Sequence, residues 1–202
     1  MEQKAALADQ FAAVVSAPPR PLPAGDVDWN TWRFRTVVVA GHYDESRQIL
    51  IDNRVHAGRV GYHVVTPLLL DDGRAVLVNR GFVAAGATRD ALPASPPPGG
   101  AVRVEGRVNP SPGQYVELGS TAPQRNVWQN LDPARFATHT GLAVLPIVLE
   151  QVAGPSDGLA RDWPKPDLGI DKHRIYMMQW YAFAALALIL WAWFTFLRRS
   201  LR

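Results

Sequence analysis

The chain has 202 residues and a formal net charge of +3, from 21 Lys and Arg against 18 Asp and Glu. Charges of both signs are interspersed and no basic cluster occurs, which excludes a nucleic-acid-binding stripe but is compatible with anionic lipid headgroups. The absence of cysteine excludes disulfides, thiolate metal sites and a thiol nucleophile.

Residues 1–24 form an N-terminal segment ahead of the predicted domain. Met1–Val15 predicts a short amphipathic helix, which is not a signal peptide because it lacks a basic region followed by an apolar run. The proline-rich link Ala17–Ala24 cannot be helical and is expected to run extended.

Four β-branched and aromatic segments then predict strands. Trp32–Tyr43 predicts the first strand, and Ile49–Arg54 predicts the strand that pairs with it. Tyr62–Leu70 and Ala75–Val83 flank the sequence Asp-Asp-Gly at 71–73. An Asp-Gly turn between two apolar runs predicts an antiparallel hairpin.

Prolines punctuate the rest of the predicted sheet. Pro67 predicts an edge or a bulge in the first strand of the hairpin. Pro93–Gly100 predicts an exposed loop. Ala143–Gln151 predicts a last strand, interrupted at Pro146.

Alternating residues and a capping pattern complete the predicted domain, residues 25–172. Val102–Val108 alternates apolar and charged residues, as a half-solvated strand does, and Asn109–Gln114 predicts a turn. Asp132–Thr140 predicts a short helix, since Asp at the N-cap is followed by Pro. The fold class is therefore mainly β (α+β), a small antiparallel β-barrel-like or sheet domain.

The C-terminal stretch predicts a transmembrane helix at 173–197 and a basic tail at 198–202. The 23 residues Ile175–Leu197 carry no formal charge. A helix of that length spans roughly 34 Å, enough for the ~30 Å core of a bilayer. Aromatic residues gather at both of its ends, as they do at lipid–water interfaces. Basic residues precede and follow the span, so charge counts do not fix its orientation.

No catalytic constellation is present in the sequence, and the chain is not expected to be an enzyme. The five histidines form no HExxH or HxH arrangement, and neither a G-x-S-x-G elbow nor a Gly-rich phosphate loop occurs. Asp71 and Asp72 resemble a carboxylate pair, but their place in a predicted turn favours solvated turn chemistry.

His173, Tyr176 and Trp180 form one stripe at the start of the predicted span. Their spacing of i, i+3 and i+7 places them on one helical face. That face has two interpretations: a surface for a flat apolar ligand or another helix, or a set of interfacial anchors that extend toward water. Spacing alone favours the anchors.

Several motifs together resemble the Surfeit locus 1 family of cytochrome oxidase assembly factors. Gly61–Leu68 (GYHVVTPL) and Val76–Val83 (VLVNRGFV) are similar to its GY-x-x-x-TPL and VLVNRGW-V patterns on either side of an acidic-Gly turn. Further matches are Trp128 with Asp132, and the His-x-x-Tyr-x-x-x-Trp-Tyr entry at 173–181. The likeness covers Arg35 to about Ala184. Departures are Phe82 in place of the usual Trp, and Asp171-Lys172 where asparagines often stand.

The resemblance implies a membrane hairpin, in which a span upstream of Met1 and the C-terminal span flank an extracytoplasmic domain. The C-terminus would then lie in the cytoplasm and the chain in the cell (inner) membrane. It also implies haem a as a cofactor, with His173 as the ligand of the haem iron and Tyr176 and Trp180 beside it. Asn79 and Arg80 are further candidates for ligand contact, although a polar strand end with a Gly bulge is the favoured interpretation there.

Two functions follow from the resemblance. The first is a membrane-anchored assembly factor that binds haem a or hands it to the oxidase. Its partners would be the cytochrome c oxidase catalytic subunit or the haem a synthase, together with membrane lipid and no nucleic acid. The second is a structural or interaction subunit of a respiratory complex without its own cofactor.

Overall fold

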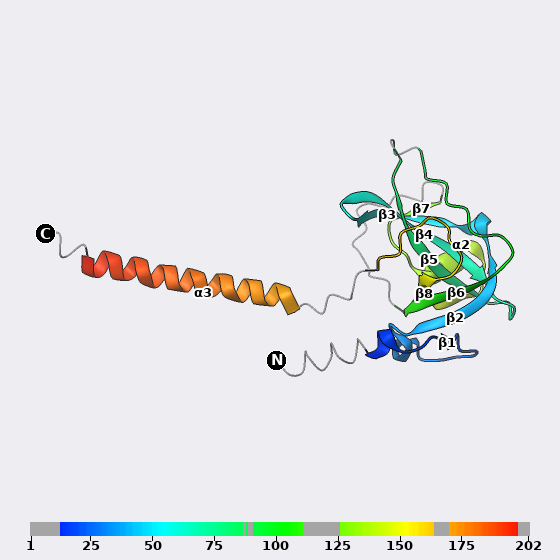
Figure 1. Ribbon diagram of the computed structural model, residues 1–202, viewed down its shortest axis with the longest axis horizontal. Coiled ribbons are helices and arrows are strands. Elements are labelled where there is room, and N and C mark those ends of the chain that lie inside the picture. The colour runs from blue at the N-terminus through cyan, green and yellow to red at the C-terminus, as the bar shows by residue number, and fades with distance from the viewer. Residues whose placement is uncertain (1–12, 87, 89–90, 111–125, 164–169, 198–202) are drawn as a thin grey trace. The chain divides into compact units, whose positions relative to one another are not determined.

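A computed structural model describes residues 13–86, 88, 91–110, 126–163 and 170–197 (Figure 1). For residues 170–176 and 196–197 the description is limited to the backbone. The chain divides into a compact β domain that ends at Trp163 and a separate unit that contains the C-terminal helix.

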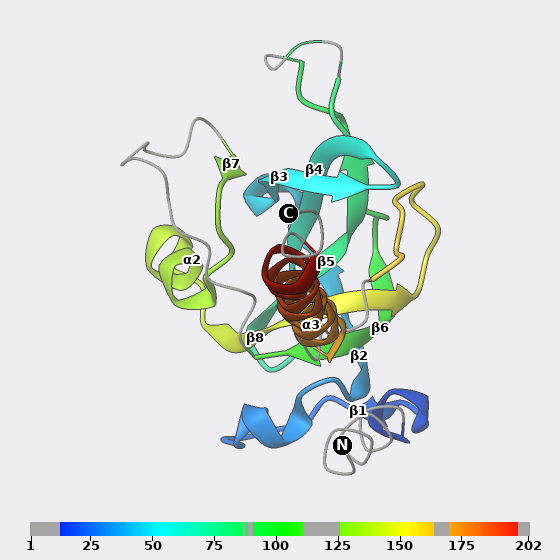
Figure 2. The same cartoon turned by 90° about the vertical axis from the view of Figure 1, so that its left-hand side faces the viewer.

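The β domain is built on one eight-stranded sheet whose ends approach each other. The strands are β1 (Arg20–Pro21), β2 (Thr36–Tyr43), β3 (Ile49–His56), β4 (Arg59–Leu69), β5 (Ala75–Ala84), β6 (Ala101–Asn109), β7 (Val127–Trp128) and β8 (Val144–Ala153). Their order is β1-β2-β6-β8-β5-β4-β3-β7, and an additional pairing of β2 with β4 closes the five central strands into a barrel (Figure 2).

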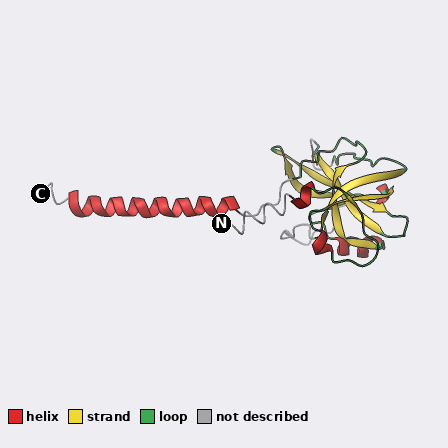
Figure 3. Ribbon diagram, turned by 60° about the horizontal axis from the view of Figure 1, so that its bottom comes forward, coloured by secondary structure: helices red, strands yellow, loops and turns green. Residues whose placement is uncertain are grey.

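Short helices join these strands, and one long helix follows them (Figure 3). They are η1 (Trp29–Trp32), η2 (Glu45–Arg47), α2 (Pro133–Thr140), α3 (Ile170–Ala192) and the π-helical turn η3 (Trp193–Leu197). As predicted, Asp132 caps α2: its side chain accepts hydrogen bonds from the backbone N–H groups of Ala134 and Arg135.

The expected antiparallel pairing is confirmed for β2–β6, β6–β8, β4–β5 and β3–β4, but it does not hold for every pair. β1 runs parallel to β2, β7 to β3, and β8 to β5. The β5–β8 pair is parallel because the chain crosses the domain through β6 and α2 before it enters the sheet beside β5. The prediction of a β-rich, barrel-like domain is confirmed at this coarser level.

The predicted pairing of the first two strands is wrong. β3 pairs with β4 through a tight turn at Ala57 and Gly58, while β2 pairs along its length with β6. Both turn residues have positive φ (48° and 75°), as type I′ hairpin turns require. The turn lacks the usual Asn-Gly or Asp-Gly signal, so the sequence did not indicate this hairpin.

The hairpin of β4 and β5 is confirmed, with Leu69 opposite Ala75 and Gly73 in the turn at a φ of 82°. Pro67 forms neither an edge nor a bulge. Instead it lies where β4 leaves β3 for β2, and its carbonyl accepts a 2.9 Å hydrogen bond from the Asp44 N–H. The missing N–H of proline is tolerated there because the strand changes neighbours.

Of the remaining predicted elements, some are confirmed, some are corrected and some lie outside the described residues. The alternating strand is confirmed as β6, whereas β8 continues through Pro146 with a register shift instead of an interruption. The loop Pro93–Gly100 is only partly exposed, since Ser95 is buried. Residues 13–16 are helical; most of the predicted N-terminal helix and of the turn at Asn109–Gln114 lies outside the described residues.

Three hydrophobic clusters stabilise the described domain, and β5 contributes buried residues to the two larger ones. Val76 and Val78 belong to the barrel interior, whereas Leu77 belongs to a second cluster that contains Phe136 of α2. Because successive strand residues point to opposite faces, β5 is buried on both sides. α2 therefore covers one outer face of the barrel.

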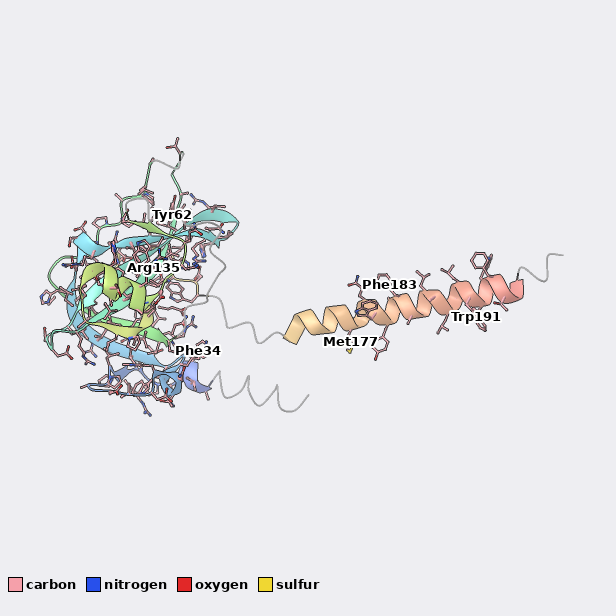
Figure 4. The ribbon with its side chains drawn as sticks, turned by 180° about the vertical axis from the view of Figure 1, so that it is seen from behind. Phe34, Tyr62, Arg135, Met177, Phe183 and Trp191 are labelled. Atoms are coloured by element: carbon pink, nitrogen blue, oxygen red, sulfur yellow. The ribbon has the colours of Figure 1, made fainter. Side chains whose placement is uncertain are left out.

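The C-terminal unit contains one helix that is long and apolar enough to cross a membrane. The apolar stretch is Met177–Thr195, 19 residues of which none is buried. At 1.5 Å per residue it measures about 28 Å. The side chains of Met177, Phe183 and Trp191 stand out from the helix and are 52%, 53% and 61% exposed (Figure 4). The helix has no core of its own to cover these side chains.

Replacing Gly41 by alanine is expected to open the barrel at the β2–β4 seam. A Cβ atom there would lie 2.3 Å from the backbone oxygen of Leu69, which cannot move without breaking the ladder. The expected loss is more than about 2 kcal/mol of unfolding free energy, measured by urea unfolding of the full chain in detergent. Gly99→Ala is the matched control, because its Cβ would meet no atom within 4 Å. Equal stability of the two variants would contradict the close β2–β4 pairing that closes the barrel.

Candidate functional site

Arg80 occupies a β-bulge at the centre of the sheet. Val64 pairs with Gly81 and Val65 pairs with Asn79, so Arg80 is the extra residue of β5. A bulge redirects the side chain of its extra residue. Here it places a guanidinium inside the domain with an exposed fraction of 0%.

Every N–H group of this guanidinium has an acceptor. Nε and Nη2 donate to Asp157 Oδ2 at 3.0 and 2.8 Å. Nη1 donates to Gln48 Oε1 and to the Ser95 carbonyl, both at 2.9 Å, and Nη2 donates to the Pro96 carbonyl at 3.0 Å. Since arginine has five N–H donors, none is left for a ligand.

Asp157 belongs to a segment that we call the strap, residues 155–163, which leads from β8 toward the C-terminal unit. Its carboxylate is buried between Arg80 and Arg161, and Arg161 Nε also donates to the Arg80 carbonyl at 2.8 Å. Next to this ion cluster, Phe82 and Ala160 exchange two backbone hydrogen bonds of 2.7 and 3.0 Å. The strap is thus fastened to β5 by charge and by backbone pairing.

Gly81 allows the strap to approach so closely. Its φ is 143°, and a Cβ atom would lie 2.6 Å from the Ala160 carbonyl oxygen. The Asn-Arg-Gly sequence at 79–81 therefore combines a bulge, a buried cation and a close backbone approach.

Tyr43 lies beside the ion cluster. The Arg80 guanidinium carbon lies 5.5 Å from the centre of its ring, and its hydroxyl donates to Gln151 Oε1 at 3.1 Å. Burial raises the pKa of Tyr43 far above its usual value, an effect that the nearby Arg80 only partly offsets. The phenol therefore stays neutral and acts as a wall of the cluster.

A second polar group, formed by His63, Asn79 and Trp163, lies one strand residue away from Arg80. Asn79 Nδ2 lies 3.2 Å from His63 Nδ1, and the His63 ring meets the Trp163 ring edge-on at 5.5 Å. Trp163 Nε1 donates to the Gln151 carbonyl at 2.7 Å. Asn79 Oδ1 is buried and has no hydrogen-bond partner among the described residues.

Burial above all, together with the charges of Arg54 and His56, lowers the pKa of His63 to about 4. At neutral pH the ring is therefore uncharged. Its Nδ1 is then an acceptor for Asn79 Nδ2.

The hydrogen bonds described above separate the two candidates for ligand contact in β5, Arg80 and Asn79. The saturated, buried Arg80 favours the structural interpretation that the sequence left open for the Asn-Arg-Gly stretch. Asn79 contacts a histidine and retains one free acceptor. Within the described part of the chain, no three His, Cys, Asp or Glu side chains are placed to hold a metal ion.

The predicted haem-binding stripe lies in the first three turns of α3. His173 and Tyr176 fall where only the backbone is described, and both are helical, so their one-face spacing holds at that level. Trp180 is 71% exposed and meets Phe183 edge-on at 6.3 Å. Their role toward a cofactor stays a prediction.

Sequence reasoning missed the acceptors that hold Arg80. Gln48, Asp157 and Arg161 come from three separate segments, and no spacing connects them to β5. The one available signal was an arginine inside an otherwise apolar strand, because a buried cation requires a partner somewhere in the fold.

The chain belongs to the SURF1 family, whose family profile matches residues 1–185. It is 28% identical over 212 aligned residues to a SURF1-like protein of Monosiga brevicollis, covering 98% of this chain and 79% of that protein. It is 30% identical to Surfeit locus protein 1 of Mus musculus, covering 93% and 66%. A shorter match, 32% identical over 68 residues, covers 32% of this chain and 18% of the cytochrome oxidase assembly protein SHY1 of Saccharomyces cerevisiae.

Asp157→Asn is expected to destabilise the domain strongly, because it leaves the buried Arg80 cation without its counter-charge. Breaking one side of a buried ion pair typically costs about 3–5 kcal/mol. The measurement is urea unfolding of the full chain in detergent. Asp72→Asn removes a carboxylate from an exposed pair with Arg74 and should have a much smaller effect, because solvent screens that pair. A small effect of both substitutions would disprove the structural role assigned to Asp157.

Stability is expected to fall between pH 6.5 and pH 4 because of His63. The unfolded chain binds a proton at this histidine as the pH falls through about 6.5, whereas the folded domain resists it until about 4. Thermal unfolding of the wild-type chain and of His63→Gln in detergent measures the effect. The wild type should lose more stability over that interval, by an amount on the order of 3 kcal/mol. His42→Gln, an exposed histidine of β2, serves as the control. Parallel pH curves for all three proteins would contradict the low pKa.

Proposed function

We propose that this chain is a membrane-anchored assembly factor for haem–copper cytochrome c oxidase, which binds haem a and hands it to the catalytic subunit. The observation that carries the proposal is membership of the SURF1 family, supported by the yeast relative, which is named a cytochrome oxidase assembly protein. The exposed apolar helix Met177–Thr195 supports the membrane anchor. The proposed location is the cell (inner) membrane, with the domain extracytoplasmic and the C-terminal arginines cytoplasmic.

The proposed haem site is the stripe of His173, Tyr176 and Trp180 on α3. A neutral imidazole is a common axial ligand of haem iron, and haem would supply the redox-active group that the oxidase requires. His173 would hold the iron, while the two aromatic side chains would form a wall for the porphyrin. A site at the end of a membrane helix suits a poorly soluble, farnesylated porphyrin.

The β domain would serve this site by holding the chain that enters α3. The strap is fixed by the Arg80–Asp157–Arg161 cluster and by the Phe82–Ala160 hydrogen bonds. It ends at Trp163, whose indole N–H is bound to the backbone of β8. Trp163 precedes Ile170, the first residue of α3, by seven residues.

His173→Ala is expected to remove haem absorbance from the purified full chain while leaving the β domain folded. The chain is produced together with a haem a synthesis pathway, and the Soret band per mole of protein is measured. Tyr176→Ala and Trp180→Ala should reduce the band less, because they would remove a wall and not an iron ligand. His42→Ala, in β2, is the histidine control.

A normal Soret band in His173→Ala would overturn the haem site on α3. Absence of a band from the wild type as well would favour the alternative class, an interaction subunit without its own cofactor. Copurification with the oxidase catalytic subunit then distinguishes an assembly partner from an unrelated membrane protein.

A further inference from the structure

The β3–β4 hairpin ends in an apolar tip that the domain does not cover. We call its four apolar residues, Val55, Ala57, Gly58 and Val60, the tip. Val55 and Val60 are cross-strand partners and therefore lie on the same face of the hairpin, where they are 68% and 59% exposed. They are the two most exposed large hydrophobic side chains of the described β domain. Figure 1 shows this hairpin, in cyan beside the β3 label, at the margin of the barrel.

The turn residues keep the tip uncharged. Ala57 adopts a φ of 48°, a conformation that asparagine, aspartate or glycine accommodates with less strain. The turn therefore presents a methyl group and a glycine to solvent, in place of the polar side chain that such turns usually carry. Together with the two valines this gives a small, continuous apolar tip.

Basic side chains border the apolar tip. Arg54 and Arg59 precede and follow the turn, and Arg59 is exposed. His56 is directly opposite Arg59 in the ladder. Asp162 adds a carboxylate at the same border, with its Oδ2 3.6 Å from His56 Nε2. Because successive strand residues alternate, Arg54, His56 and Arg59 lie beside the tip on the face of the hairpin opposite Val55 and Val60.

The hairpin is held against the strap, on the route to α3. The His56 ring packs on Phe82 with 5.2 Å between ring centres, and its imidazole reaches Asp162 of the strap. Asp162 precedes Ile170, the first residue of α3, by eight residues. A fully extended chain of eight residues spans at most about 28 Å. If α3 crosses a bilayer, this length limit keeps the hairpin within reach of that bilayer's surface.

We propose that the tip inserts into the interfacial layer of an anionic membrane, the same membrane that α3 is proposed to cross. Apolar side chains that reach the acyl boundary, bordered by arginines at the depth of lipid phosphates, are the arrangement that interfacial elements use. A protein partner fits less well, because two valines and one alanine provide far less than the roughly 800 Å² per partner of a stable interface. The proposal rests on the proposed anchoring by α3.

A single engineered cysteine can test the insertion, because the chain contains no other cysteine. Ala57→Cys, labelled with the environment-sensitive dye NBD, reports on the tip. Asp71→Cys is the matched control, since it lies in the exposed turn at the other end of β4. The labelled full chains are reconstituted into vesicles of phosphatidylcholine alone or of phosphatidylcholine with phosphatidylglycerol. Acrylamide quenching and the emission maximum are recorded for each.

The expected result is a blue-shifted, weakly quenched signal at position 57 in the anionic vesicles and an aqueous signal at position 71 in both. Val60→Asp in the Ala57→Cys background should restore the aqueous signal. Arg59→Glu should lower the ratio of inserted to free tip by at least about fivefold. Both side chains are exposed, so the thermal unfolding temperature should remain unchanged.

Extraction of the vesicles with alkali separates the two proposals. A chain that resists extraction but gives the same aqueous signal at positions 57 and 71 overturns the tip insertion alone. Protection of position 57 that requires added oxidase catalytic subunit also overturns it, in favour of a protein partner. Release of the chain by alkali overturns the anchoring, and the tip proposal with it.

Discussion

The domain depends on the burial of one positive charge. A guanidinium in an apolar interior is unstable unless each of its donors is matched, and Arg80 meets this requirement only with acceptors from distant parts of the chain. Gln48 precedes β3, the Ser95 and Pro96 carbonyls belong to the loop before β6, and Asp157 belongs to the strap. One side chain therefore specifies where three otherwise irregular segments must lie.

This constraint also explains why the loop with three successive prolines is ordered near Ser95. Prolines have no N–H to donate, so such a loop cannot join a sheet, but its carbonyl groups remain available as acceptors. Arg80 uses two of them. These hydrogen bonds to Arg80 fix the position of the loop, as ladder hydrogen bonds fix a strand, although the loop has no regular secondary structure.

The sequence predicted those features that arise from local chemistry. The Asp-Gly turn at 71–73, the capped helix at Asp132 and the alternating strand at Val102–Val108 each depend on residues a few positions apart, and all three are confirmed. The partner of β2 was missed because strand pairing depends on the whole topology. The hairpin at Ala57 was missed because Ala57 has a positive φ, a conformation that alanine rarely adopts and that the sequence therefore does not predict. The same distinction applies to the candidate site. The Asn-Arg-Gly residues themselves indicated a bulge, but nothing in the sequence indicated which residues accept hydrogen bonds from Arg80.

The strap also determines how the domain would respond to mechanical force. Tension applied to the chain beyond Trp163 would act first on the indole bond to β8, then on the two Phe82–Ala160 hydrogen bonds and on the Asp157 ion cluster. These bonds lie on different strands, so the load is divided between β5 and β8, which are themselves adjacent and parallel. A pull from the helical segment would thus be distributed into the interior of the barrel, and the terminal strand would not peel away residue by residue.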